Sequence, residues 1–251
     1  MLLLGYQIST LYPELPVEKQ TIINTINPHS YCVAKKDDLF RKALRQAEIL
    51  IPDGFGIVLA AKMICRQRIA RIAGSDIHQR LLNDAQRKNL KVFYLGSSER
   101  TLQRIAERVN MEYPSIQVNT YSPPYKPVFS GEENLEMIRI VNNFAPDILF
   151  VGMTAPKQEK WVHEYKAALN VKVICAIGAV FDFYAGTVHR PGIFWQRIGL
   201  EWMPRLICEP RRLWRRTLIS MPLFLLDVLI EMLSRNADTA AKGMQNFTSS
   251  N

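Results

Sequence analysis

Three short apolar runs, each followed by or ending near a glycine, constrain the fold of this chain most strongly. The runs and their glycines are residues 91–95 with Gly96, residues 147–151 with Gly152, and residues 172–177 with Gly178. Segments of helical length separate the runs, which is typical of parallel strands joined by crossover helices. A weaker strand is expected over residues 116–121. The pattern predicts an α/β fold with a Rossmann-like, mainly parallel sheet and flanking helices.

The first half of the chain continues this pattern less regularly. Residues 21–26 predict a strand, and the apolar positions of residues 37–47 repeat at helical spacing. The run 49–51 stops abruptly at a Pro-Asp-Gly turn, and a further helix is expected to begin near Ser75, with a serine or an aspartate as its N-cap. Residues 1–10 are expected to form a first strand and not a signal peptide, because no basic segment precedes their leucines.

The glycines at the strand ends indicate where a ligand would bind. In open parallel sheets, ligands bind beyond the carboxyl ends of the strands, where the backbone approaches them closely. Gly152 and Gly178 are therefore candidate substrate-binding positions. The alternative is that these glycines only begin turns, and the sequence leaves it open.

Four polar residues of the first half fall at the same expected edge. Asp53 lies in the Pro-Asp-Gly turn, and Thr25 and Asn27 stand at the end of another expected strand. Arg71 precedes the helix expected near Ser75, and an arginine beside a helix N-terminus suits a diphosphate. Asp-Gly is also an ordinary turn sequence, so the turn alone favours a structural interpretation of Asp53.

Two later segments offer further candidates. Lys157 and Gln158 follow Pro156 at the expected start of a helix, beside the crevice. Asp182 stands in the segment GAVFDFYAG, whose aromatic residues suit either a core or a wall that stacks on a base. As isolated patterns, a surface loop and a core segment are the alternatives.

The sequence lacks several signatures of phosphate and metal sites. It contains no G-x-G-x-x-G, no G-x-x-x-x-G-K-[ST] and no pair of histidines spaced for zinc. It also lacks the Asp-x-Asp with which many nucleotide-sugar enzymes hold a divalent metal. We therefore expect no metal and no cofactor, with phosphates neutralised by backbone amides and arginine.

Positive charge gathers near the C-terminus. The net charge is +9, and residues 190–216 hold seven arginines against two glutamates. Residues 217–233 are apolar and at the lower length limit for crossing a bilayer, and Ser220, Asp227 and Glu231 fall on one helical line. The pattern favours a helix in the membrane interface behind arginines that meet anionic head groups. Packing on the core or on a second subunit, and true spanning, are the alternatives.

These observations divide the chain into three parts. Residues 1–195 are expected to form the α/β core, residues 196–235 a basic and amphipathic appendage that associates with the membrane, and residues 236–251 a disordered tail. The core is expected to stay folded without residues 217–251. The four cysteines have no metal or redox spacing, which is typical of reduced thiols in a cytosolic protein.

Five blocks of the sequence together resemble one family. The blocks are PDGFG at 52–56, RIAGSD at 71–76, PKQEKW at 156–161, GAVFDFYAG at 178–186 and LEWMPRLICEPRRLWRR at 200–216. In this order and spacing they resemble the WecG/TagA/CpsF glycosyltransferases, glycosyltransferase family 26, over roughly residues 5–216.

The resemblance implies a function in bacterial surface polysaccharide synthesis. Its members are inverting, metal-independent enzymes that move N-acetylmannosamine, its uronic acid, glucose or glucuronic acid from a UDP-sugar to an undecaprenyl-diphosphate-linked saccharide. The implied partners are the UDP-sugar, the lipid-linked acceptor and the anionic inner face of the plasma membrane, to which the protein binds peripherally. A homo-oligomer is possible, and no nucleic acid is expected as a partner. The alternative is a non-catalytic protein that binds nucleotides or nucleic acid through its C-terminal arginines.

The resemblance also assigns residues to the pocket. It places the family's catalytic aspartate at Asp53 and its active-site threonine and asparagine at Thr25 and Asn27, although the local sequence NTINPHS is a looser match. Arg71 and Gln158 match polar residues of the family's pocket.

An inverting transfer needs one base for the acceptor hydroxyl and, without a metal, cations for the leaving diphosphate. Asp53 is the expected base, and Asp182 is the second choice. The expected cations are Arg71 and one or more arginines of the C-terminal appendage, which by the family resemblance completes the active site at the membrane: Arg205, Arg211, Arg212, Arg215 and Arg216.

Overall fold

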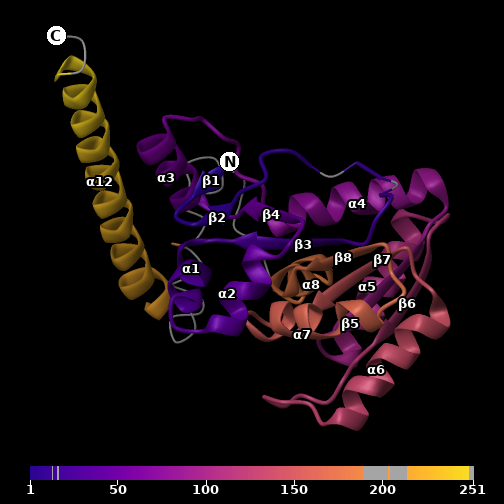
Figure 1. Ribbon diagram of the computed structural model, residues 1–251. Coiled ribbons are helices and arrows are strands. Elements are labelled where there is room, and N and C mark those ends of the chain that lie inside the picture. The colour runs from indigo at the N-terminus through magenta and orange to yellow at the C-terminus, as the bar shows by residue number, and fades with distance from the viewer. Residues whose placement is uncertain (13, 16, 189–202, 204–213, 249–251) are drawn as a thin grey trace.

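The computed structural model describes residues 1–12, 14–15, 17–188, 203 and 214–248. A six-stranded parallel sheet with the strand order β4-β3-β8-β7-β5-β6 forms the centre of this part of the chain (Figure 1). Its strands are β3 (Thr21–Ile26), β4 (Ile49–Pro52), β5 (Lys91–Gly96), β6 (Gln117–Tyr121), β7 (Ile148–Gly152) and β8 (Val173–Ala176). The predicted parallel sheet is confirmed, and the weak pattern of β6 is explained by its place at the sheet edge.

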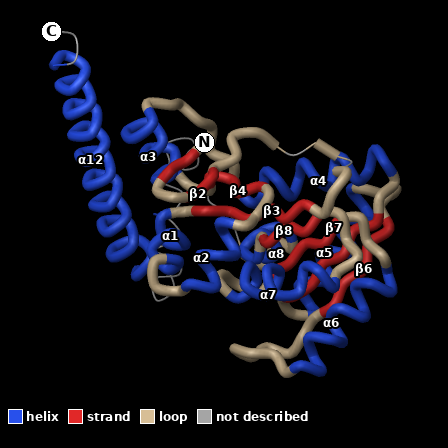
Figure 2. Tube along the Cα trace, in the orientation of Figure 1, coloured by secondary structure: helices blue, strands red, loops and turns tan. Residues whose placement is uncertain are grey.

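Helices cover both faces of the sheet (Figure 2). One face carries α4 (Gly74–Lys88), α5 (Glu99–Glu112) and α8 (Gly178–Tyr184). The other face carries α6 (Gly131–Phe144) and α7 (Lys157–Tyr165), which continues into the 3-10 helix η1 (Lys166–Ala168). The remaining helices of the first half are α1 (Pro28–Ala34), α2 (Asp38–Arg45) and α3 (Phe55–Cys65).

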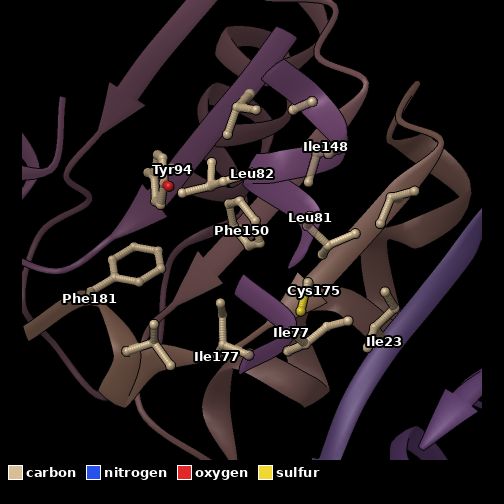
Figure 3. Packing of buried hydrophobic residues seen from close by; sticks show 14 of the residues in the cluster. Ile23, Ile77, Leu81, Leu82, Tyr94, Ile148, Phe150, Cys175, Ile177 and Phe181 are labelled. Carbon is tan, nitrogen blue, oxygen red and sulfur yellow. The ribbon is translucent and has the colours of Figure 1, made fainter. Parts of the chain in front are cut away.

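Alternating side chains of each strand build two separate cores. Ile23 and Tyr94 face α4, α5 and α8, whereas their neighbours Ile22 and Phe93 face α6 and α7. Figure 3 shows the first core, in which Phe181 of α8 lies beside Tyr94. Because both faces are covered, the strands are nearly uniform apolar runs, which is why the sequence revealed them.

The start of α4 differs from the expected cap. The helix begins at Gly74 with Ala73 as its N-cap, and no serine or aspartate occupies that position. Asp76 instead accepts a hydrogen bond from the Ala73 backbone N–H at 3.0 Å, from inside the first turn. The predicted serine or aspartate N-cap is therefore wrong, although Asp76 satisfies one of the terminal donors.

The N-terminal segment is a hairpin and not a strand of the main sheet. β1 (Leu2–Leu3) and β2 (Tyr6–Gln7) pair in an antiparallel manner around Leu4 and Gly5, both of which have a positive φ. Leu3 and Tyr6 are buried in a third apolar cluster together with α1, α2 and α3. This hairpin therefore packs against α2 and α3.

The C-terminal appendage is part of that third cluster. Its described part is a π-helical turn, η2 (Arg215–Ser220), followed by α12 (Met221–Thr248). Phe224 and Val228 of α12 are completely buried, and the Phe224 ring meets the Tyr31 ring edge-on at 5.3 Å. Removal of residues 217–251 would take Phe224 and Val228 out of this cluster, so we expect it to lower the stability of the core.

The polar line of the appendage faces the protein. Ser220 Oγ lies 2.9 Å from His29 Nδ1, and Asp227 forms an ion pair of 2.7 Å with Lys35. The large apolar side chains that remain exposed are Leu218, Ile219, Leu223, Leu226, Leu229, Ile230 and Leu233. Ser220 and Asp227 thus pair with the core, Glu231 pairs with Arg235 of the same helix, and an apolar face points outward.

Two further features of this helix bear on the predicted organisation. α12 runs across residue 236, where a disordered tail was expected, and the described residues are helical up to Thr248. Residues Arg215–Arg235 are the one helix of the described chain that is long and apolar enough to cross a membrane, with a mean hydropathy of 1.8. In Figure 1, α12 projects away from the sheet.

Candidate active site

Asp53 and Asn27 meet at the carboxyl ends of β4 and β3. The parallel register pairs Ile26 with Pro52, so Asn27 and Asp53 are the next residues of neighbouring strands. The Asp53 backbone N–H donates to the Ile26 carbonyl at 2.8 Å, which extends the ladder by one bond. The structure therefore brings together the end of β3, with Thr25 and Asn27, and the half-buried Asp53.

Asn27 also fixes the start of α1. Its Oδ1 accepts hydrogen bonds from the backbone N–H groups of His29 and Ser30, both at 3.0 Å, and Ser30 Oγ accepts from the Asn27 N–H in return. This capping box holds the side chain in one orientation beside Asp53. The cap was not foreseen when Asn27 was considered as a ligand residue.

The RIAGSD block contacts both the end of β4 and the turn that follows β8. The Ile72 N–H donates to the Pro52 carbonyl at 3.0 Å, so Arg71 lies at the end of β4, one residue from this bond. At Gly74 a β-carbon would lie 3.1 Å from Val180 and 3.3 Å from Ile177, at the start of α8. The first turn of α4 is therefore packed on the β8–α8 turn, and Arg71 is half-buried beside it.

Hydrogen bonds to Gln158 link the β8–α8 turn to the β7–α7 loop. Gln158 Oε1 accepts hydrogen bonds from the Gly178 N–H at 3.1 Å and from the Met153 N–H at 3.2 Å. At Gly178 a β-carbon would lie 2.5 Å from this oxygen, so only glycine fits there. The Gln158 amide, predicted to contact substrate, binds the backbone of two loops.

The sequence reasoning missed Glu159, which lies beneath Gln158. Its side chain is 2% exposed, and its Oε1 accepts a hydrogen bond of 2.9 Å from Gln158 Nε2. Burial raises the pKa of this carboxyl to about 7, while the bond from Gln158 acts in the opposite direction. The helical pattern of α7 does not indicate its burial, because Glu159 lies about 100° around the helix from Gln158, to the side of the face that Gln158, Trp161 and Val162 share.

Gly152, predicted to contact substrate, is required by the packing of α8. A β-carbon at this position would lie 2.7 Å from the Phe181 ring, which is itself buried. The ring thus occupies the space that a side chain would need. This packing accounts for the glycine without any ligand.

A substitution separates packing from ligand contact. Gly152→Ala is expected to lower the free energy of unfolding by about 1–3 kcal/mol, because the buried ring must move. Gly131→Ala is the control, since a β-carbon there meets nothing within 4 Å. Urea unfolding measures both. A Gly152→Ala variant as stable as the wild type but inactive would show that a ligand needs the glycine.

Lys157 and Asp182 lie in the two helices that follow these loops, α7 and α8. Lys157 Nζ donates to the Lys126 carbonyl at 2.5 Å and lies 3.5 Å from the centre of the Phe129 ring. Burial lowers the pKa of this ammonium. Asp182 is half-buried in α8, and its carbonyl accepts from the Thr187 N–H at 3.0 Å. Lys157 therefore holds the loop before α6.

The start of the appendage lies beside α1 and the residues that follow Asp53. Ser220 contacts His29 as described, and a β-carbon at Gly56 would lie 3.4 Å from Met221 Sδ. Burial, and after it the charge of Arg216, lowers the pKa of His29. Arg215 is exposed and stacks at 5.3 Å on the Trp214 ring. The other predicted arginines of the appendage lie outside the described residues: Arg205, Arg211 and Arg212.

The described part of the chain contains no group of three or more His, Cys, Asp or Glu side chains that could hold a metal ion. Its cationic groups near the strand ends are arginine and lysine. Chemistry at this edge can therefore draw on a carboxylate, backbone amides and guanidinium groups.

Comparison with known proteins identifies the family. The model of the glycosyl transferase WecG/TagA/CpsF family matches residues 7–238. An N-acetylglucosaminyldiphosphoundecaprenol N-acetyl-beta-D-mannosaminyltransferase of Bacillus spizizenii is 33% identical over 215 residues, 86% of this chain and 81% of that protein. The enzyme of the same name from Bacillus subtilis is 31% identical over 210 residues, 84% and 79% of the two chains.

A more distant relative has the same name. The protein from Staphylococcus aureus strain MRSA252 is 25% identical over 228 residues, which cover 91% of this chain and 87% of that protein. The family match spans both the sheet and the first part of α12. The resemblance of the five sequence blocks is thereby confirmed, and the chain belongs to the WecG/TagA/CpsF family of glycosyl transferases.

Proposed function

We propose that this protein transfers N-acetylmannosamine from UDP-N-acetylmannosamine to an N-acetylglucosamine unit carried on undecaprenyl diphosphate. The relatives' names supply the sugar and the acceptor. The observation that carries the proposal is the position of Asp53 beside Asn27 at the carboxyl ends of two adjacent parallel strands. Ligands bind at this edge in open α/β sheets.

The proposed stereochemistry is inversion. The relatives are named for a β-linked product. In the donor that we propose, the sugar is α-linked to UDP. A single displacement then needs one base to accept the proton of the acceptor hydroxyl. Asp53 is that base in our proposal, with Asp182 as the second choice, and Thr25 and Asn27 line the acceptor side.

Charge at the leaving UDP is neutralised without a metal in this proposal. Arg71 adjoins the end of β4, and Arg215 and Arg216 begin η2, the helical part of the appendage that packs on α1. Guanidinium groups bind phosphate in a bidentate manner, which suits them to a developing diphosphate charge. Arg205, Arg211 and Arg212 belong to the same proposed set, and Gly178 together with Lys157 flanks the donor.

The outward face of α12 supports attachment to the inner surface of the plasma membrane. A lipid-linked acceptor must reach the site from the bilayer, and seven large apolar side chains between Leu218 and Leu233 are exposed on one side of the appendage. Buried Phe224 and Val228 hold the opposite side on the protein. A helix with one face on protein and an apolar face outward favours a peripheral position over a spanning one.

Transfer is tested by incubating the purified protein with a panel of UDP-sugars and a short-chain polyprenyl-diphosphate-N-acetylglucosamine. We expect UDP release and a β-linked disaccharide with UDP-N-acetylmannosamine, at the same rate in EDTA as in Mg²⁺, because no metal takes part. Loss of turnover in EDTA that Mg²⁺ or Mn²⁺ restores would contradict metal independence.

The same assay separates the proposal from its non-catalytic rival. A nucleotide-binding regulator would bind UDP without releasing it from any donor. A nucleic-acid-binding protein would shift DNA in a salt-dependent manner through its C-terminal arginines. If a well-folded protein transfers sugar from none of the UDP-sugars, sugar transfer is excluded and those two functions remain.

A further inference from the structure

A single buried amide holds two of the loops at the carboxyl edge of the sheet. Gln158 is 4% exposed, and its Oε1 receives the N–H of Met153, directly after β7, and the N–H of Gly178, at the start of α8. The two loops also touch, since a β-carbon at Gly178 would lie 3.1 Å from the Thr154 nitrogen. Their spacing therefore depends on which way the Gln158 amide points.

Glu159 determines that orientation. An amide presents an oxygen on one side and an NH₂ group on the other, so a reversed Gln158 would set two donors against the Met153 and Gly178 N–H groups. Glu159 Oε1 accepts from Gln158 Nε2 at 2.9 Å and keeps the amide oxygen on the side of the loops. Both side chains are buried, so water does not compete for these bonds.

The held loop has a strained backbone. Thr154 has a φ of +70°, which is unfavourable for a β-branched residue. Such a conformation costs about 1–3 kcal/mol and persists only where surrounding contacts impose it. Thr154 and Ala155 are exposed, so the strained segment presents its surface outward at the edge where ligands bind.

Glu159 is also costly to the fold. Its Oε2 is buried, and no partner for it exists within the described residues. A buried carboxyl oxygen without a partner destabilises the folded state, and an apolar residue of similar volume would avoid that penalty. A glutamate at position 159 therefore orients Gln158 at a cost to the stability of the folded protein.

We propose that Glu159 is a positioning residue for sugar transfer, which acts through Gln158 to hold the β7–α7 and β8–α8 loops in the spacing that receives the sugar diphosphate of the donor. The assignment of the ligand rests on the proposed function, whereas the link from Glu159 to the two loops does not. Glu159 touches no reacting atom in this scheme. Misplacement of a binding loop by about 1 Å can lower a rate by about a hundredfold.

The test compares Glu159→Leu with Glu159→Gln in the full-length protein. Leucine removes the acceptor, whereas glutamine can still accept from Gln158 Nε2. We expect Glu159→Leu to lower turnover by about ten- to a hundredfold and to speed hydrogen exchange at the Met153 and Gly178 amides. Glu159→Gln should restore both. Glu164→Leu, on the exposed side of α7, is the control and should change neither.

Each outcome decides the proposal. Unchanged exchange at the two amides in a folded Glu159→Leu protein would overturn it, whatever the activity. Loss of turnover in Glu159→Gln with normal exchange would overturn it too, because the carboxylate itself would then be needed. If Glu159→Leu does not fold, Glu159→Met takes its place, since methionine has nearly the length of glutamate and also removes the acceptor of Gln158 Nε2. A wild-type protein without transferase activity would refute the proposed function alone, because the exchange measurement needs no substrate.

Discussion

Asp53→Asn is expected to lower turnover by about two to four orders of magnitude while the affinity for UDP stays within a few-fold of the wild type. The substitution keeps the shape of the side chain and removes its ability to accept a proton, and general-base catalysis contributes a factor of this size. The Asp53 N–H bond to the Ile26 carbonyl is a backbone interaction and is retained. Single-turnover kinetics and calorimetric titration with UDP measure the two quantities.

Asp182→Asn is the matched control for this experiment. Both aspartates are half-buried, but Asp182 lies within α8, and only Asp53 adjoins Asn27. We expect Asp182→Asn to retain most of the turnover. An Asp53→Asn protein with more than about a tenth of the wild-type rate would move the role of base to Asp182 or exclude a single base.

The sequence predicted the sheet well because of the way its strands are buried. Strands covered on both faces read as continuous apolar runs, and β5, β7 and β8 have no exposed residue. The order of Thr25, Asn27 and Asp53 along two strands was also readable, because parallel strands end at the same edge. The pairing of β3 with β4, which the structure supplies, then places Asn27 next to Asp53, with Thr25 opposite Ile51.

The direction of individual side chains was not readable in the same way. Position at a helix N-terminus suggested that Gln158 faces a ligand, but its partners Met153 and Gly178 are on two different loops, and Gly178 is 20 residues away. Asp227 lies on the polar line of α12, and its partner Lys35 is 192 residues away. A polar residue in an apolar helix can face water or a distant partner, and only the tertiary structure distinguishes the two.

The appendage has two apolar faces that substitutions can separate. Phe224→Ala is expected to lower the free energy of unfolding by about 3–5 kcal/mol, because it leaves a cavity against Tyr31 in the third cluster. Leu223→Ala, the adjacent and exposed position, should change it by less than about 1 kcal/mol. Urea unfolding of the two variants measures the difference. Equal stabilities would mean that α12 does not pack on the core.

The exposed face can then be examined in a protein that stays folded. The double variant Leu226→Ser, Ile230→Ser removes apolar area that is already exposed, so its stability should match the wild type. Its binding to anionic vesicles should fall by roughly tenfold or more, because transfer of each side chain into the bilayer contributes on the order of 1–2 kcal/mol. Truncation before residue 217 cannot replace this comparison, since it removes Phe224 and Val228 together with the outer face. Vesicle binding equal to that of the wild type would show that the outer face contacts something other than lipid. A folded double variant with full turnover on a soluble acceptor and low turnover on a vesicle-bound one would show that the helix delivers the enzyme to its acceptor and takes no part in the chemistry.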